Sequence, residues 1–125
     1  MTTDTLRPLV DTLKVLAHPV RLRILALLQG GELCVCEVAD VLGLAPSTVS
    51  EHLTGLRRTG LVRERKVGRW VHVALSDAEA VQPMLEALWP LMAAAEADLA
   101  RDRAQALTLR CGACESDRCP IPDPA

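Results

Sequence analysis

The chain has 125 residues, half of them apolar, and its 14 Lys and Arg against 16 Asp and Glu give a formal net charge of −2. This length predicts one compact domain with little room for a deep catalytic cleft, which argues against a large metabolic enzyme. The sequence has no run of 18 apolar residues and no secretory signal pattern, so we expect a cytoplasmic protein that does not enter a membrane. With no Phe, no Tyr and two Trp, the core must use Leu, Val, Ala and Ile, which favours a mostly helical fold.

Apolar residues at helical spacing predict two helices in the first 30 residues. The first helix covers about residues 5–17 and is broken by His18 and Pro19. Pro19 suits the first turn of a second helix, which ends at Gly30-Gly31. His18, directly before this proline, is expected to cap or pack at the helix start and not to bind a ligand.

Two further helices are predicted on either side of a tight turn at Leu44-Ala45. One covers about residues 37–43 and ends at Gly43, and the other begins at Pro46 and ends at Gly60. Two helices joined in this way are a helix-turn-helix candidate. The second of them is expected to bury an apolar stripe formed by Val49, Leu53 and Leu56.

A β-hairpin is predicted next. The runs 61–67 and 70–75 flank Gly68-Arg69, and the second run alternates apolar residues with others. The pattern Ser76-x-x-Glu79 then predicts the capped start of a long Ala- and Leu-rich helix that reaches about Leu107. Within this helix two prolines are expected to start or kink it, Pro83 and Pro90.

The fold class predicted from these elements is mostly α with a small β-hairpin, a winged helix-turn-helix domain over residues 1–107. Residues 108–125 contain three cysteines and several prolines and lack a periodic pattern. We expect this segment to be a tail that becomes ordered only if something holds it.

A winged helix places its second helix in the DNA major groove and its hairpin along the backbone. Residues 46–75 carry six basic and two acidic side chains, a local charge of +4, so the remaining residues sum to −6. The positive charge is therefore concentrated where contacts to phosphate are needed. With Val49 turned to the core, we expect contacts to double-stranded DNA from Ser47, Thr48, Ser50, Glu51, His52, Thr54, Arg57, Arg58, Lys66 and Arg69.

Two histidines in this region have alternative roles. His52 falls near the buried stripe of its helix, so packing at the boundary of the core and contact with phosphate are both open. His72, in the second run of the hairpin, is expected to be exposed and near phosphate. It has no neighbouring His in the sequence with which to bind a metal.

Three stretches carry a family resemblance: Leu16-Ala17-His18-Pro19-Val20-Arg21-Leu22-Arg23-Ile24-Leu25, Glu32-Leu33-Cys34-Val35-Cys36-Glu37, and Ser47-Thr48-Val49-Ser50-Glu51-His52-Leu53 through Gly60-Leu61-Val62. Over about residues 5–80 the chain resembles the ArsR/SmtB family. The resemblance implies a homodimeric repressor that binds a palindromic operator and leaves it when a metal or metalloid binds. It also implies dimerisation through the N- and C-terminal helices, which are long and apolar in this sequence.

The five cysteines form two clusters, and in a reducing compartment such clusters indicate metal binding or redox sensing. Cys34 and Cys36 are two positions apart, which turns them about 200° from each other on a helix but to one side on an extended chain. They can therefore share an ion only where the chain is not helical. Soft thiolates select soft ions.

The resemblance to the arsenic-sensing branch implies As(III) or Sb(III) as inducer, with Cd or Pb as further options, Cys34 and Cys36 as ligands, and no permanent cofactor. That branch commonly has a third cysteine three positions after the second, where this chain has Ala39. We hypothesise that the tail of either subunit supplies the third thiolate, while a separate tail site for an ion and idle tail thiols are the alternatives. The tail cysteines are Cys111, Cys114 and Cys119.

The ion is expected to draw Cys34 and Cys36 together, distort the start of the third helix and re-aim the recognition helix. A redox or reactive-sulfur sensor on the same fold is an alternative that needs no metal. An enzyme is the remaining alternative, a thiol oxidoreductase or arsenate reductase using Cys111-Gly112-Ala113-Cys114. This motif lies in a proline-rich tail and not after a strand of a βαβ unit, so we expect no catalysis.

Overall fold

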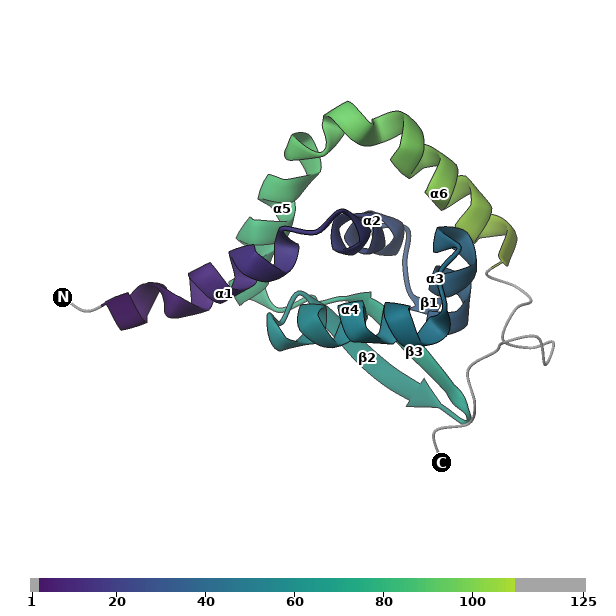
Figure 1. Ribbon diagram of the computed structural model, residues 1–125, viewed down its shortest axis with the longest axis horizontal. Helices are drawn as coiled ribbons and strands as arrows, with labels where there is room; N and C mark the ends of the chain where they lie inside the picture. The colour runs from purple at the N-terminus through teal and green to yellow at the C-terminus, as the bar shows by residue number, and fades with distance from the viewer. Residues whose placement is uncertain (1–2, 110–125) are drawn as a thin grey trace.

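The computed structural model describes residues 3–109, and their fold is mostly helical with a small antiparallel sheet, as predicted (Figure 1). None of the helices in this part of the chain is both long enough and apolar enough to span a bilayer. The elements are η1 (Thr3–Leu6), α1 (Arg7–Leu16), α2 (Pro19–Leu28), β1 (Leu33–Cys34), α3 (Val35–Leu42), α4 (Pro46–Arg58), β2 (Val62–Val67), β3 (Trp70–Leu75), η2 (Glu79–Val81), α5 (Gln82–Leu91), η3 (Ala93–Ala95) and α6 (Glu96–Leu109).

Helix α1 extends from the body of the molecule as an arm (Figure 1). Four large apolar side chains on η1 and α1 are 38% to 51% exposed, namely Leu6, Leu9, Val10 and Leu13. The arm ends where His18 adopts an extended backbone conformation, and Pro19 opens α2 as predicted. The Nδ1 atom of His18 accepts a hydrogen bond from the backbone N–H of Val20 at 3.1 Å, which confirms that this histidine caps α2.

Helices α3 and α4 form the predicted helix-turn-helix pair. Gly43 ends α3 in the left-handed conformation, with a φ of 68°, so the chain can reverse without the steric cost of a Cβ atom. Helix α3 begins at Val35, two residues earlier than predicted, which places Cys36 in its first turn. The predicted stripe of α4 is confirmed, because no member is more than 2% exposed: Val49, Leu53 and Leu56.

The hairpin is confirmed as β2 and β3, but it belongs to a three-stranded sheet in the order β1-β3-β2. The prediction of only two strands was wrong, because Leu33 and Cys34 pair with β3 as a third, short strand. Leu33 lies opposite Val73, and Cys34 lies opposite His72. A strand of two residues is too short to show the alternation from which strands are predicted.

The long C-terminal helix was predicted as one element, and this was wrong. The chain instead forms η2, α5, η3 and α6, which arch over α2 (Figure 1). Ser76 does not open a helix with Glu79, because its Oγ atom accepts a hydrogen bond from the N–H of Ala78 in a short turn. The break between α5 and α6 follows Pro90 and lets α6 fold back, so that Leu99 and Ala106 are buried.

The core lies between α2, α3, α4 and the sheet, and α6 covers one side of it. An ion pair joins α6 to α2, because Asp102 accepts hydrogen bonds from Arg23 Nε at 2.9 Å and from Arg23 Nη2 at 3.0 Å. This contact raises the pKa of the Arg23 guanidinium above its ordinary value. The side chains without exposed surface include Ile24, Leu25, Val38, Val49, Leu56 and Val73.

Candidate functional site

The outward face of α4 is polar, as predicted. Ser47, Ser50 and Glu51 are exposed, and Thr48 and Thr54 are partly buried beside them. The Oγ1 atom of Thr54 donates to the carbonyl oxygen of Ser50 at 2.9 Å, so this hydroxyl is partly used within the helix. Short polar side chains on an exposed helix face are of a size to reach base edges and phosphates in a major groove.

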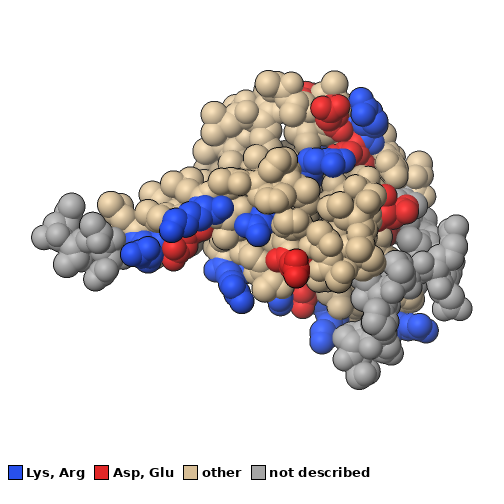
Figure 2. All heavy atoms as spheres, in the orientation of Figure 1, with Lys and Arg blue, Asp and Glu red and all other residues tan. Residues whose placement is uncertain are grey.

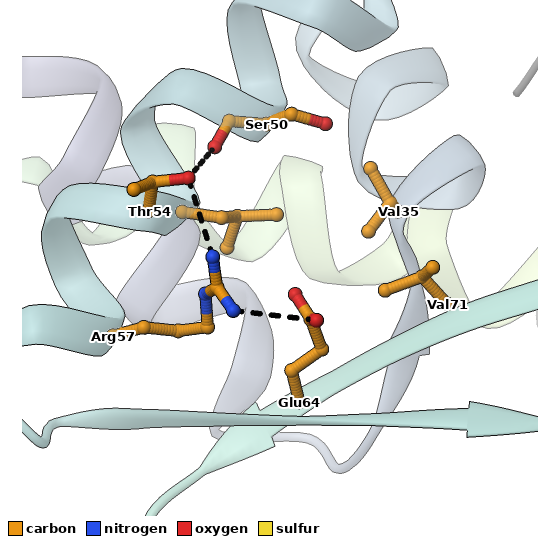
Figure 3. A pocket seen from close by; sticks show the side chains of 7 residues that line it. Val35, Ser50, Thr54, Arg57, Glu64 and Val71 are labelled. Atoms are coloured by element: carbon orange, nitrogen blue, oxygen red, sulfur yellow. Dashed lines mark hydrogen bonds and ion pairs between the residues drawn. The ribbon is translucent and has the colours of Figure 1, made fainter. Parts of the chain in front are cut away.

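Arg57, at the end of α4, is held by the protein itself. Its Nη1 atom lies 3.3 Å from Oε1 of Glu64 on β2, and its Nη2 atom lies 3.4 Å from Oγ1 of Thr54 (Figure 3). This ion pair connects the recognition helix to the hairpin. The other basic residues predicted to contact DNA are exposed: Arg58, Lys66 and Arg69.

A second ion pair connects the hairpin to the segment before β1. Glu32 accepts a hydrogen bond from Arg65 Nε at 2.9 Å, and its Oε1 atom is 3.7 Å from Nδ1 of His72. The hydrogen bond from Arg65 lowers the pKa of Glu32 below its ordinary value. In Figure 2 basic and acidic side chains alternate along the lower edge of the molecule, where α4 and the hairpin lie in Figure 1.

His52 occupies the packing position that the sequence left open. Its side chain is partly buried, its ring centroid is 4.5 Å from that of His18, and its Nδ1 atom accepts from Arg21 Nε at 3.1 Å. The Nδ1 atom of the His52 ring is therefore already hydrogen-bonded to Arg21. No local pattern predicts this contact, since Arg21 lies 31 residues earlier in the chain.

Cys34 and Cys36 lie together at the start of α3. Cys34 is the N-cap residue, with an extended backbone at φ −75° and ψ 147°, whereas Cys36 is already helical. Their Sγ atoms are 3.0 Å apart, and the two residues are 0% and 3% exposed. One extended residue is therefore enough to bring the sulfurs to one side, as the sequence analysis required.

Glu37 completes this helix start. Its Oε1 atom accepts a hydrogen bond from the backbone N–H of Cys34 at 2.8 Å, in a capping box with Cys34. Glu37 is only 5% exposed, and its Oε2 atom is buried without a hydrogen-bond partner in the described part of the chain. The role of this carboxylate was not predicted, because capping boxes are recognised by Ser or Thr at the N-cap and here the position holds Cys.

The state of the two sulfurs differs. Cys34 is disulfide-bonded, and Cys36 keeps its thiol. Among residues 3–109, no group of three or more His, Cys, Asp or Glu side chains is arranged to hold a metal ion. The remaining cysteines predicted as ligands, Cys111, Cys114 and Cys119, lie outside the described residues.

Comparison with known proteins identifies the family. Residues 18–64 match the family described as "Bacterial regulatory protein, arsR family". The chain is 44% identical over 79 residues to the transcriptional activator HlyU of Vibrio cholerae, a stretch that covers 63% of this chain and 72% of that relative. The chain belongs to the ArsR family.

Other members of the ArsR family are similar to parts of the chain. The arsenical resistance operon repressor of Escherichia coli K12 is 44% identical over 68 residues, which cover 54% of this chain and only 58% of that repressor. The solved structure of Vibrio cholerae HlyU matches with a TM-score of 0.62 at 40% identity, over 73% of this chain and 97% of that one. A solution structure from Mycobacterium bovis matches with a TM-score of 0.64 at 29% identity, over 71% of this chain and 82% of that one. It is described as the homodimeric winged helix-turn-helix DNA-binding domain of a possible ArsR-family transcriptional regulator.

Two physical contacts join the cysteine pair to the DNA-facing elements of this ArsR-family chain. Val35, between the two cysteines, lines a small cavity together with Ser50 and Thr54 of α4 and Val71 of β3 (Figure 3). Cys34 is paired through its backbone with His72 of β3. The segment that carries the two cysteines is therefore adjacent to both α4 and the hairpin.

Proposed function

We propose that this chain is a transcriptional repressor that binds a palindromic operator as a homodimer and is released when arsenite or antimonite binds its cysteine thiolates. The observation that carries the proposal is the buried pair of Cys34 and Cys36, built into the first turn of α3 and in contact, through Val35, with the recognition helix. Cadmium and lead are further soft ions that thiolates select. Membership of the ArsR family supports the regulatory role.

In this proposal α4 enters the major groove and the β2–β3 hairpin follows the backbone. Ser47, Ser50 and Glu51 provide the exposed polar face of the helix. Arg58, Lys66 and Arg69 provide exposed positive charge for phosphate. His52 contributes by packing and not through a direct contact, because its ring faces Arg21 and His18.

The proposed dimer uses the arm and the C-terminal helices. The arm presents apolar side chains that are about half exposed, and Leu91 on α5 is 78% exposed. Apolar surface of this kind is typical of an interface with a second copy. The double variant Leu9→Asp/Leu13→Asp should shift the chain from dimer to monomer in sedimentation velocity, and an unchanged dimer would refute this interface.

The proposed inducer site contains Cys34 and Cys36 as thiolates. Bonds between sulfur and a soft ion such as zinc are about 2.3 Å long, so two sulfurs 3.0 Å apart are within reach of one ion. The Oε2 atom of Glu37 is buried and has no hydrogen-bond partner among the described residues, so it can still accept a hydrogen bond at the start of α3. Because Cys34 is disulfide-bonded here, ion binding requires its prior reduction.

The third thiolate is proposed to come from the tail of either subunit. Helix α6 packs against α3, the helix that carries Cys36, and its last residue, Leu109, stands two positions before Cys111 in the sequence (Figure 1). Cys111, Cys114 and Cys119 are the candidate donors.

The effect on DNA follows from the position of α3. The two sulfurs are already 3.0 Å apart and buried, so an ion bound between them would have to displace the first turn of α3 to make room. Val35 would transmit that movement to Ser50 and Thr54 of the recognition helix. DNA must then weaken ion binding by the same factor by which the ion weakens DNA binding. Equal ion affinity with and without operator would refute this mechanism.

The experiment that tests the function is release of operator DNA, followed by fluorescence anisotropy under reducing conditions during titration with arsenite, cadmium, lead and zinc. Arsenite should release the wild type, and the double variant Cys34→Ser/Cys36→Ser should stay bound. The single variants Cys111→Ser, Cys114→Ser and Cys119→Ser test the tail. Three unaffected single variants would refute a tail ligand.

Ala39 offers a matched gain-of-function control. It is 3% exposed on α3, one turn after Cys36, at the position where the arsenic-sensing branch commonly has its third cysteine. In a chain that lacks all three tail cysteines, Ala39→Cys should restore release by arsenite, because a thiolate at this position replaces the tail donor. Failure to restore it would contradict a three-sulfur site at the start of α3.

The second candidate function is a thiol-redox or reactive-sulfur-sensing repressor on the same fold. It is favoured by the disulfide-bonded state of Cys34 and by the Cys36 thiol 3.0 Å from its sulfur. In this case DNA binding would ignore every ion but respond to peroxide, which oxidises the Cys36 thiol, or to sulfide. Hydrosulfide would attack the disulfide of Cys34, break its S–S bond, leave a persulfide on one cysteine and release the other as a thiolate. Mass spectrometry of the treated protein would identify the disulfide or persulfide.

A further inference from the structure

Arg21 lies where the arm, α2 and the recognition helix meet. Its Nη1 atom donates to the carbonyl oxygen of Val15, near the end of α1, at 3.1 Å. Its Nε atom donates to Nδ1 of His52, in the middle of α4, at the same distance. A Cβ atom added at Gly55, one turn further along α4, would lie 3.5 Å from Cζ of Arg21, so the guanidinium rests against the helix backbone at this glycine.

Both histidines of this cluster act as hydrogen-bond acceptors. Nδ1 of His52 accepts from Arg21, and Nδ1 of His18 accepts from the N–H of Val20. A ring nitrogen that accepts a hydrogen bond carries no proton, so the His52 imidazole that accepts from Arg21 is neutral, with its proton on Nε2. Protonation of His52 would turn its acceptor into a second positive donor facing the Arg21 guanidinium.

The charged and titratable groups that act on His52 come from two elements. His18 and Arg21 face it from α2 and its N-cap, and Glu51 belongs to α4 itself. From α1 the cluster receives only the carbonyl oxygen of Val15, which does not titrate. Burial lowers the pKa of His52 most, the electrostatic interactions with His18 and with the Arg21 guanidinium lower it further, and Glu51 opposes them.

We propose that Arg21 is a positioning residue for the recognition helix α4, which it holds through its hydrogen bond to neutral His52. Protonation of His52 breaks this hydrogen bond and thereby weakens DNA binding. The inference rests on the proposed reading of DNA by α4. Arg21 joins α4 to the end of the arm at one point. Loss of its hydrogen bond to His52 therefore lets the polar face of the whole helix shift relative to DNA. A small shift in a recognition helix disturbs every base and phosphate contact that it makes.

The sign of the pH effect separates this role from a direct contact. If His52 touched phosphate, protonation would add a positive charge and strengthen DNA binding on acidification. If His52 instead accepts the hydrogen bond that positions Arg21, protonation breaks this hydrogen bond. DNA binding then weakens by up to tenfold per subunit for each pH unit below the pKa of His52. The two roles therefore predict opposite slopes.

The test measures DNA affinity by fluorescence anisotropy between about pH 7.5 and about pH 5.5 at constant ionic strength. The probe is a duplex selected from a random library with the full chain at neutral pH. The wild type should lose affinity on acidification, and His52→Asn should give a flat profile because the Asn carbonyl oxygen accepts from Arg21 but does not titrate. His52→Phe should bind weakly and without pH dependence, because it keeps a ring but no acceptor.

His18→Asn is the matched control, since Asn also caps a helix and removes the other titrating ring. It should keep the slope of the wild type. A wild-type affinity that rises on acidification would overturn the inference, as would a slope that survives in His52→Asn.

A measurement without DNA separates this inference from the proposed function. Nitrogen-15 NMR of the histidine side chains should show His52 with an unprotonated Nδ1 atom, and Arg21→Met should shift this resonance. A proton on Nδ1 at neutral pH would refute the hydrogen bond from Arg21 to His52 and leave the proposed DNA binding untouched. A wild type that binds no DNA would refute the proposed function, and the NMR result would still decide whether this hydrogen bond exists.

Discussion

Glu64 should limit the affinity of this chain for DNA, and Glu64→Gln should raise it. The carboxylate lies 3.3 Å from Arg57 and competes with DNA phosphate for the guanidinium. The side chains of Arg57 and Glu64 are 40% and 25% exposed, so the pair belongs to the class of exposed ion pairs, which contribute about 0.2–1 kcal/mol. Removing the competitor should therefore strengthen binding by about 1.4- to 5-fold per subunit.

The salt dependence gives a second, independent measure of the same effect. If Arg57 moves from Glu64 to a phosphate, each subunit neutralises one more phosphate, and the slope of log K against log salt should steepen by about 0.9. Adding Arg57→Gln to Glu64→Gln should return the slope to that of the wild type, because the released guanidinium is then absent. Both quantities come from one anisotropy titration series at four or five salt concentrations.

Glu79→Gln is the control for a general change in charge. It removes the same unit of negative charge from an exposed residue of η2, outside α4 and the hairpin. An equal gain in Glu79→Gln would assign the effect to net charge and not to the release of Arg57. Unchanged affinity and slope in Glu64→Gln would refute the reasoning, because Arg57 would then stay with its internal partner in the complex.

Three other properties follow from the structure. Asp102→Asn should cost about 1–2 kcal/mol, read as a loss of several degrees in Tm, because it weakens the two-point contact with the partly exposed Arg23; an unchanged Tm would contradict this. Gly43→Ala should lower the free energy of unfolding in urea by about 1 kcal/mol, because φ is 68° at this position. No atom lies within 4 Å of the added Cβ atom, so the loss has only a backbone cause, and an unchanged free energy of unfolding would refute it. Because Arg65 lowers the pKa of Glu32 below 4.5, the stability from this pair is complete above pH 4.5 and is lost as pH falls through the lowered pKa. Glu32→Gln should therefore flatten the acid limb of the stability curve, and an unaltered limb would exclude the pair as its source.

Short-range signals in the sequence were sufficient for the DNA-facing unit. Pro46 and the helical period of Val49, Leu53 and Leu56 predicted α4, and Gly68 predicted the turn of the hairpin. Each of these signals involves residues within one or two turns of each other. Such local preferences act before tertiary packing and survive it here.

The errors come from contacts between distant residues. The paired strand β1 depends on Val73 and His72, about 40 positions later, and two residues alone show no period. The prolines were correctly predicted to start or kink the C-terminal helix, since Pro83 lies in the first turn of α5 and α5 ends just after Pro90. The complete break into α5 and α6 was not predicted, because the stretch that follows is rich in Ala and favours a helix. It occurs because α6 then buries Leu99 and Ala106 against the core.

The candidate site was predicted in its residue types but not in its internal pairing. Charge counting predicts that Arg57 contacts phosphate, yet it could not show that Glu64 on another element holds this arginine. The helical projection placed His52 at the edge of the core, yet the choice between its two roles needed the position of Arg21. Pairing across elements requires the fold, because it depends on which elements pack together.

The two internal ion pairs also constrain how the proposed inducer can act. Adding Glu32 to residues 46–75 reduces the charge of the DNA-facing unit from +4 to +3, because Glu32 holds Arg65 of the hairpin. A movement of the strand of Cys34 that broke this pair would return a positive charge to the hairpin, and that change alone would strengthen DNA binding. Release from DNA therefore cannot arise from the charge of the hairpin. The proposed mechanism instead assigns release to the orientation of α4, which lies next to Val35 of the cysteine segment and which Arg21 holds against the arm.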